Sequence, residues 1–167
     1  VTGKAAKTIF DFPVTADVAH PLVEFSTAQL DFEYSFVPNV PVMPQTQPVT
    51  LRNVSPLPLG FSIRTSPPFS VDRPDWMLEP NEAATVNVHF DAGFTADRTC
   101  TKMKSKLTLA YQDNPQKDSI DLTGEINFPN LSFSTTKLNF GCVLNDTMKR
   151  QKLTITNTSP IAAKYSW

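Results

Sequence analysis

The sequence predicts an all-β fold of the immunoglobulin-like sandwich type. The chain has 167 residues, of which 15 are proline, and it shows little of the periodicity of amphipathic helices. Short runs of alternating apolar and polar side chains are typical of strands. About seven such runs precede residue 128, with a turn signal every ~8–12 residues, which is the pattern of a two-sheet sandwich.

Each expected strand is a short apolar run bounded by turn residues. In chain order these strands are 22–25, 29–32, 49–53, 59–64, 85–90, 106–111 and 120–126, with 69–71 as a shorter candidate. In the clearest of them, Val86, Val88 and Phe90 point to one side, and His89 points to the solvent side. Burial of these three apolar side chains contributes roughly 1.5–3 kcal/mol each.

The sequence repeats itself at the spacing of one small domain. Residues 21–32 return as residues 129–140, 108 positions later, and residues 49–57 return as residues 153–161 at an offset of 104. Repetition at such an offset is typical of an array of similar units. In the second copy we expect strands at 131–133, 137–140, 151–157 and 162–167.

These repeats predict the domain organisation. Residues 1–3 echo residues 122–124 and are interpreted as the tail of a preceding domain. Residues 4–20 are a linker, residues 21–128 a complete domain, and residues 129–167 the first part of a following domain. Because that last part would leave Leu153 and Ile155 uncovered, we expect the natural chain to continue.

Two segments connect the expected domains. The linker of residues 4–20 includes Ile9, Phe10, Phe12 and Val14, so it is too apolar for a free linker and is expected to pack on a flanking domain. The connection from the complete domain into the second copy is short, and we expect it to hold the two units in a near-fixed relation.

Composition excludes several classes of function. Forty per cent of the residues are apolar, enough for a core, and the net charge is −1, so we expect no nucleic-acid partner. No stretch reaches the ~18 uncharged apolar residues that span a bilayer. Cys100 and Cys142 form no C-x-x-C pair, so neither a disulfide scaffold nor a zinc site is expected, and both thiols are predicted to be reduced.

Four Asn-x-Ser/Thr sequons occur, at Asn53, Asn130, Asn145 and Asn157. In a secreted protein they would be glycosylation acceptors. Asn53 and Asn157 occupy the same repeat position, and there Asn-x-Ser-Pro is interpreted as a turn between strands.

The sequence indicates no enzyme. Its five glycines form no phosphate-binding loop. His20 and His89 have no neighbouring cysteine or carboxylate in the sequence that would indicate a triad or a metal site. The aspartates Asp72, Asp75 and Asp91 are weak as a carboxylate pair and are expected to be solvated loop charges. We therefore predict no catalytic residue, no cofactor and no metal.

One candidate interaction feature is basic. Lys102, Lys104 and Lys106 alternate along a strand and so form a row on its outer face, with Arg98 nearby. Such a row suits an acidic partner, for example the acidic surface and tails of microtubules. The alternative is that lysines on an exposed strand prevent aggregation between sheet edges.

A second candidate feature is apolar. Residues 34–44 are rich in proline and carry Phe36, Val40 and Met43, and the second copy is four residues shorter in this region. The segment either docks a neighbouring protein or caps its own sandwich as an edge strand. Sequence alone does not separate these two interpretations.

The assembled motifs resemble those of ASH domains. The residues that carry the resemblance are Leu-x-Phe-Ser-Thr-x-x-Leu-x-Phe (131–140), the turns Asn-x-Ser-Pro, the run Leu-x-Pro-Asn-Glu (78–82) before a strand, and Leu-x-Gly-x-Ile (122–126) at the end. ASH domains are PapD-like and major-sperm-protein-like immunoglobulin modules, found in tandem in ciliary and centrosomal proteins. Glu33 stands where the family usually has glycine, so the first bend is expected to differ.

Over residues 118–160 the resemblance is closer still, to one very long family member of motile cilia. It implies a non-enzymatic scaffold of the axoneme, on a central-pair projection of the C2 microtubule that normal ciliary motility needs. The implied partners are other central-apparatus proteins and, directly or indirectly, tubulin. The alternative function is that of a secreted or periplasmic PapD-like adhesive or chaperone domain.

Overall fold

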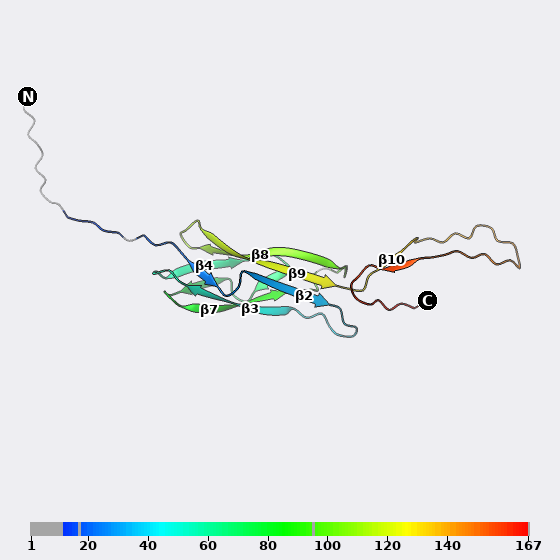
Figure 1. The fold of residues 1–167 in the computed structure, drawn as a ribbon, viewed down its shortest axis with the longest axis horizontal. Coiled ribbons are helices and arrows are strands. Elements are labelled where there is room, and N and C mark those ends of the chain that lie inside the picture. The colour runs from blue at the N-terminus through cyan, green and yellow to red at the C-terminus, as the bar shows by residue number, and fades with distance from the viewer. Residues whose placement is uncertain (1–11, 17, 95, 167) are drawn as a thin grey trace, which may run out of the picture.

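The computed structural model describes residues 12–16, 18–94 and 96–166, and these residues form strands and no helix. Nine strands build a sandwich of two sheets, and a separate two-stranded hairpin follows at one end (Figure 1). The strands are β1 (Val23–Phe25), β2 (Gln29–Ser35), β3 (Gln45–Asn53), β4 (Leu59–Arg64), β5 (Phe69–Val71), β6 (Asp75–Leu78), β7 (Ala83–Phe90), β8 (Thr101–Tyr111), β9 (Lys117–Asn127), β10 (Leu131–Phe133) and β11 (Ile155–Asn157). The predicted all-β, immunoglobulin-like sandwich is confirmed.

The first two strands belong to different sheets. One sheet has the order β1-β3-β7-β5 and the other the order β2-β9-β8-β4-β6, and the pairing of β2 with β9 is parallel. The crossing is fixed at both ends by backbone hydrogen bonds: Ser26 N donates to Thr50 O in one sheet, and Asp121 N donates to Ala28 O in the other. A single short segment thereby joins both layers at their edge.

The core lies between the two inner faces and follows the predicted alternation. Val86, Val88 and Phe90 of β7 are buried as expected, and the buried positions of β8 and β9 alternate in the same way. Phe32 and Phe69 pack against the ring of Phe90, with centroid separations of 5.2–5.8 Å within this group. Dense packing of this kind leaves little room for extra atoms.

Gly124 shows how tight this packing is. A Cβ atom built at Gly124 would lie 2.5 Å from Cε2 of Phe90 and 3.2 Å from Cζ of Phe69. The motif Leu-x-Gly-x-Ile therefore needs glycine at this position, because the rings of Phe90 and Phe69 leave no space for a Cβ atom.

Two strand predictions were incomplete in the first unit. The strand β6 was not expected, because its sequence Asp-Trp-Met-Leu does not alternate polar and apolar residues, although Trp76 and Leu78 are the less exposed side chains in the structure. Residues 36–44 do not form an edge strand but a loop between β2 and β3. Of the two interpretations of this segment, capping the sandwich as an edge strand is thus wrong.

The strand predictions for the second copy were largely wrong. Only β10 and the short β11 form, whereas 137–140, 151–154 and 162–166 contain no strand. In the first unit, the counterpart of 137–140 is β2, which pairs with β9. Residues 129–166 contain no counterpart of β8 or β9, so these segments have no strand beside them.

The connection between the sandwich and the hairpin is held from both sides. Phe128 is buried, and its ring packs on Tyr34 and Phe36 with centroid separations of 5.6 Å. Asn130 Oδ1 accepts from Cys100 N at 3.0 Å, while Asn130 O accepts from Thr158 N at 3.0 Å. This residue thus links a loop of the sandwich to the hairpin.

At the other end of the sandwich lies the N-terminal linker. Ile9 and Phe10 lie outside the described residues, and Phe12 and Val14 are exposed, so the expected packing is not found for these last two side chains. The proposed domain boundaries stay predictions.

Candidate interaction surface

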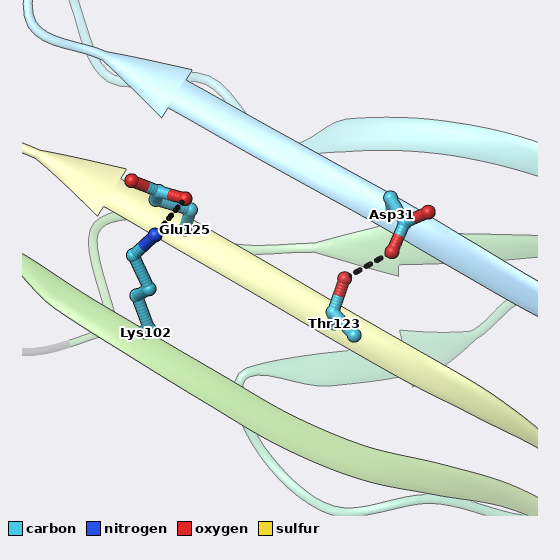
Figure 2. Close-up of polar contacts among 4 residues, drawn as sticks. All are labelled: Asp31, Lys102, Thr123 and Glu125. Atoms are coloured by element: carbon cyan, nitrogen blue, oxygen red, sulfur yellow. Dashed lines mark hydrogen bonds and ion pairs between the residues drawn. The ribbon is translucent and has the colours of Figure 1, made fainter.

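The outer face of β2, β9 and β8 carries the three lysines singled out from the sequence. Cross-strand register places Lys102 beside Glu125, Lys104 beside Thr123 and Lys106 beside Asp121. On the far side of β9, the parallel partner β2 contributes its own carboxylates at Asp31 and Glu33. Figure 2 shows Lys102, Glu125, Thr123 and Asp31 on one face of these three strands.

Two of the three lysines are paired with carboxylates. Lys102 Nζ lies 2.9 Å from Glu125 Oε2, and Lys106 Nζ lies 3.4 Å from Asp121 Oδ1. Both pairs are exposed, so each contributes at most about 1 kcal/mol. Within the part of the chain that the structure describes, Lys104 forms no ion pair.

The face as a whole is therefore balanced in charge and not strongly basic. Asp31, Glu33, Asp121 and Glu125 stand beside the three lysines. This balance weakens the expectation that the lysine row attracts an acidic surface at long range. It agrees better with the alternative, in which the lysines keep sheet edges apart, and contact with tubulin stays a prediction.

Asp31 is held by two side-chain hydrogen bonds. Thr123 Oγ1 donates to its carboxylate, and Gln29 Nε2 donates to Asp31 Oδ1 at 2.5 Å. These two donors, Thr123 first, keep the pKa of Asp31 below its usual value. The carboxylate thus stays charged on a fully exposed face.

Two open hollows flank the centre of this face. One, of 370 Å³, is lined by Gln29, Lys106 and Asp121, and the other, of 410 Å³, by Glu33, Lys102 and Glu125; Lys104 and Thr123 border both. Both are shallow surface features of the sheet, not enclosed ligand cavities such as small molecules prefer.

The apolar candidate residues lie apart from the lysines, in the loop after β2. Phe36 is partly buried against the core through its contact with Phe128. Val40 is 53% exposed and Met43 is 65% exposed. Phe36 therefore has a structural role, whereas Val40 and Met43 are free to contact a neighbour, which stays a prediction.

The described residues bring no catalytic or metal-binding group together. They contain no cluster of three or more His, Cys, Asp or Glu side chains that could hold a metal ion. His89 is half-buried, and its Nδ1 forms a hydrogen bond with Thr46 Oγ1 at 2.8 Å. Cys100 and Cys142 are both free thiols. None of the described residues form a helix with the length and hydrophobicity needed to cross a membrane.

The Asn-x-Ser-Pro motif forms a turn, as expected. Asn53 is fully buried: its Nδ2 donates to Leu57 O and Leu78 O, and its Oδ1 accepts from N and Oγ of Ser55. Asn157 repeats the bonds to Ser159 and Ile161. In both copies the side-chain amide holds the turn.

Sequence reasoning missed two glutamines that cover the outer edge of β2. Gln45 Nε2 donates to Glu33 O and Gln47 Nε2 donates to Asp31 O, both at 2.7 Å. The two residues alternate along β3 and so lie on one side of it. That period of two was the only sequence signal, and it did not identify β2 as the neighbour.

No family model matches this chain. Among solved structures, a protein of unknown function from Porphyromonas gingivalis W83 matches with a TM-score of 0.50 at 18% identity, covering 64% of this chain and 47% of that chain. This likeness concerns the fold alone. The ASH / PapD-like domain 7 of human CEP192 matches with a TM-score of 0.45 at 12% identity, over 62% of this chain and 84% of that chain.

Curated relatives match almost the whole chain. The human Hydrocephalus-inducing protein homolog is 34% identical over 98% of this chain, and the mouse Hydrocephalus-inducing protein is 27% identical over 99% of it. The chain spans only 3% of the length of either relative. It is thus similar over nearly its whole length to a short segment of Hydrocephalus-inducing protein, which confirms the resemblance that its motifs indicate.

Proposed function

We propose that this chain is one docking unit of a non-enzymatic scaffold in the axoneme of motile cilia. The scaffold lies on the central-pair projection of the C2 microtubule that normal motility requires. The observation that carries the proposal is the similarity to Hydrocephalus-inducing protein (Hydin) over 98% of the chain. A small all-β sandwich is well suited to such a structural role.

The partners follow from the surface. Neighbouring central-apparatus proteins are the first candidates, because charge balance on the β2–β9–β8 face favours close and specific contact over long-range attraction. Direct contact with tubulin requires Lys102 and Lys106 to exchange their present carboxylates for those of the microtubule. The test is sedimentation of the chain with microtubules, compared with a variant in which Lys102, Lys104 and Lys106 are glutamate. Loss of sedimentation in the variant would favour direct contact of the lysines with tubulin, and unchanged sedimentation would leave the lysines as a device against aggregation.

The alternative of a secreted or periplasmic domain is less compatible with the sequons. Both polar atoms of the buried Asn53 side chain are engaged in hydrogen bonds, and Asn157 repeats most of these bonds. The Asn130 side chain bonds to Cys100 and to Arg98. Asn145 and Asn157 are the exposed sequons among these four. Glycans on Asn53 or Asn130 would contradict the structure as well as the axonemal location.

Cryo-electron tomography of motile cilia that carry a cleavable density tag on the natural protein tests the proposal. Tag density on a projection of the central pair, lost on cleavage, is the expected result. Density at the basal body, or none within the cilium, would overturn the axonemal location while leaving the fold unaffected.

A further inference from the structure

The strand β8 is longer than the strand beside it. It pairs with β9 from Thr101 to Ala110, but with β4 only from Thr108 to Tyr111. After Arg64, Ser66 Oγ still lies 3.0 Å from Ser105 Oγ. The chain then crosses to the other sheet through Pro67 and Pro68, which have no backbone N–H to offer a ladder. Within the described residues, the edge of β8 from 101 to 107 that faces away from β9 has no strand partner.

Two backbone hydrogen bonds show which residues face this vacant edge. Gln112 N donates to Gly60 O, so even-numbered residues of β8 direct their backbone groups to the β4 side. Asp121 N donates to Ala28 O, so the odd-numbered residues of β9 direct their backbone groups to β2 and the even-numbered ones to β8. Even-numbered residues of β9 lie opposite odd-numbered residues of β8, so the even-numbered residues of β8 face away from β9, in agreement with the first bond. The backbone N–H and C=O groups of Lys102, Lys104 and Lys106 therefore point to the vacant edge.

Burial along β8 changes at the same point. Leu109 lies in the part of β8 that pairs with β4, and Leu107 lies directly before that part. Both side chains are fully buried. Met103 and Ser105, on the same inner face of the unpaired half, are only half-buried. The inner face is thus incompletely covered where a neighbouring strand is missing.

Other edges of the sandwich are less suitable for strand addition. The edge of β2 is covered by the side-chain amides of Gln45 and Gln47. The edge strands β1, β5 and β6 have only three, three and four residues. The vacant half of β8 offers a longer run of backbone, and short or covered edges are how sheets avoid unwanted pairing.

The positive charges of Lys102, Lys104 and Lys106 limit which strand can pair with the vacant edge of β8. A second copy of β8 would place lysines opposite lysines, and like charges directly opposite each other destabilise a strand pair. Carboxylates at alternate positions would face Lys104, which has no ion pair among the described residues, and share Lys102 and Lys106 with Glu125 and Asp121. On its other face, the added strand would cover Met103 with apolar side chains, while the hydroxyl of Ser105 is already bonded to Ser66.

We propose that the vacant edge of β8 binds an extended segment of a partner protein, added antiparallel to β8, with acidic and apolar residues in alternation. The proposal rests on the docking role proposed above and names the edge that performs it. Binding by the purified chain and location in the axoneme are measured separately, so failure of one is distinguishable from failure of the other.

The test uses the purified chain and an eight-residue peptide of alternating valine and glutamate. Two further peptides carry N-methyl groups, one on every valine amide and the other on every glutamate amide. An added strand bonds β8 through one of its edges only. One methylated peptide should therefore lose about tenfold or more in affinity, while the other stays within about twofold of the parent.

Two protein variants locate the site. Lys104→Ala removes the charge and keeps the backbone N–H, and Lys104→Pro also removes the N–H that faces the vacant edge. We expect a two- to fivefold loss for Lys104→Ala and roughly a tenfold or greater loss for Lys104→Pro. Lys117→Ala, which removes the same charge at the exposed far end of β9, is the matched control and should bind as the parent does.

Peptide composition separates strand addition from simple charge attraction. A peptide with lysine in place of glutamate should not bind, and an all-glutamate peptide, which resembles an acidic tail, should bind more weakly because it brings no apolar residues to Met103. Equal binding by both methylated peptides would overturn the proposal. So would backbone resonance shifts confined to β5 or β6, or no binding of the parent peptide, and the methylation result holds even if Lys104→Pro fails to fold.

Discussion

The two sequence repeats form the same local structure at their start. In the first, β1 pairs with β3 so that Val23 faces Asn53; in the second, β10 pairs with β11 so that Leu131 faces Asn157. These positions correspond in the repeat, and both pairs run antiparallel. The repeated segment, without β8 or β9 beside it, is therefore sufficient to fix this antiparallel strand pair and its register.

Side-chain hydrogen bonds repeat as well. Thr27 Oγ1 donates to Gln29 O, and in the second repeat Thr135 Oγ1 donates to Lys137 O, both at 2.8 Å. Gln47 Nε2 donates to Asp31 O, and its counterpart Gln151 Nε2 donates to Asn139 O. The threonine bond is local and stabilises a turn. The glutamine bond joins segments 16 residues apart in the first repeat and 12 apart in the second.

Burial separates the two repeats. Leu30 and Phe32 are 6% and 2% exposed, whereas their counterparts Leu138 and Phe140 are 44% and 39% exposed. The first pair lies on β2, which β9 holds against the opposite sheet, and the second pair has no such neighbour. Pairing with β9 is therefore what makes the repeated segment a core strand in the first repeat, whereas its counterpart in the second repeat stays irregular.

The largest expected difference in stability between the two repeats is that between the variants Phe32→Ala and Phe140→Ala. Phe32 packs on Phe69 and Phe90, so its truncation should cost about 3–5 kcal/mol through lost contacts and a cavity. Phe140→Ala should stay within about 0.5 kcal/mol, as for exposed positions. Urea unfolding followed by circular dichroism measures both, and equal losses would mean that the second repeat is also packed.

Asn53→Ala against Asn157→Ala tests the repeated turn. Asn53 is buried and additionally donates to Leu78 O, so its loss leaves several buried groups unsatisfied and should cost about 1–3 kcal/mol. Asn157 is exposed and water can replace its bonds, so Asn157→Ala should cost less than about 1 kcal/mol. The midpoint of urea unfolding gives both values, and a smaller effect at Asn53 would contradict the assigned role of its amide.

Much of the first unit could be predicted from the sequence. The strands 59–64 and 69–71 match β4 and β5, and the alternation of β7, β8 and β9 correctly identified their buried side chains. Period-two patterning has a clear signal where one strand face is buried and the other is solvated. The turn at Asn53 was predictable because its residue types act locally.

The rest depended on contacts between segments far apart in the sequence. The strand β6 forms because β4 lies beside it, and the strand expected at 137–140 fails because no neighbour is present. The lysine row was found from its spacing, but its ion pairs with Glu125 and Asp121 follow from the β8–β9 register. The vacant edge of β8 likewise appears only once the lengths of β4 and β8 are compared.

High pH should destabilise the first unit. Burial, and then the hydrogen bond from the Tyr111 hydroxyl to Asp118 Oδ2, raise the pKa of Tyr111 above its ordinary value. The folded chain therefore keeps this proton after the unfolded chain has lost it, so stability falls as the pH rises above about 10. Tyr111→Phe should remove part of that fall in urea titrations at pH 9–11, and an unchanged slope would contradict the assignment.

The smallest expected effect is a difference in the pH dependence of stability at low pH, which arises because Asp31 can titrate and its counterpart Asn139 cannot. Hydrogen bonds from Thr123 and Gln29 lower the pKa of Asp31, so its contribution is present above the unfolded pKa of about 3.9 and is lost as the pH falls through the lower folded value. Asp31→Asn gives the first repeat the residue that the second already has. Its urea midpoint should therefore depend slightly less on pH between 2 and 5 than that of the parent, while Asp121→Asn serves as a control on the same face. A larger effect for Asp121→Asn would mean that its ion pair with Lys106, and not the Thr123–Asp31 contact, sets the acid sensitivity of this sheet.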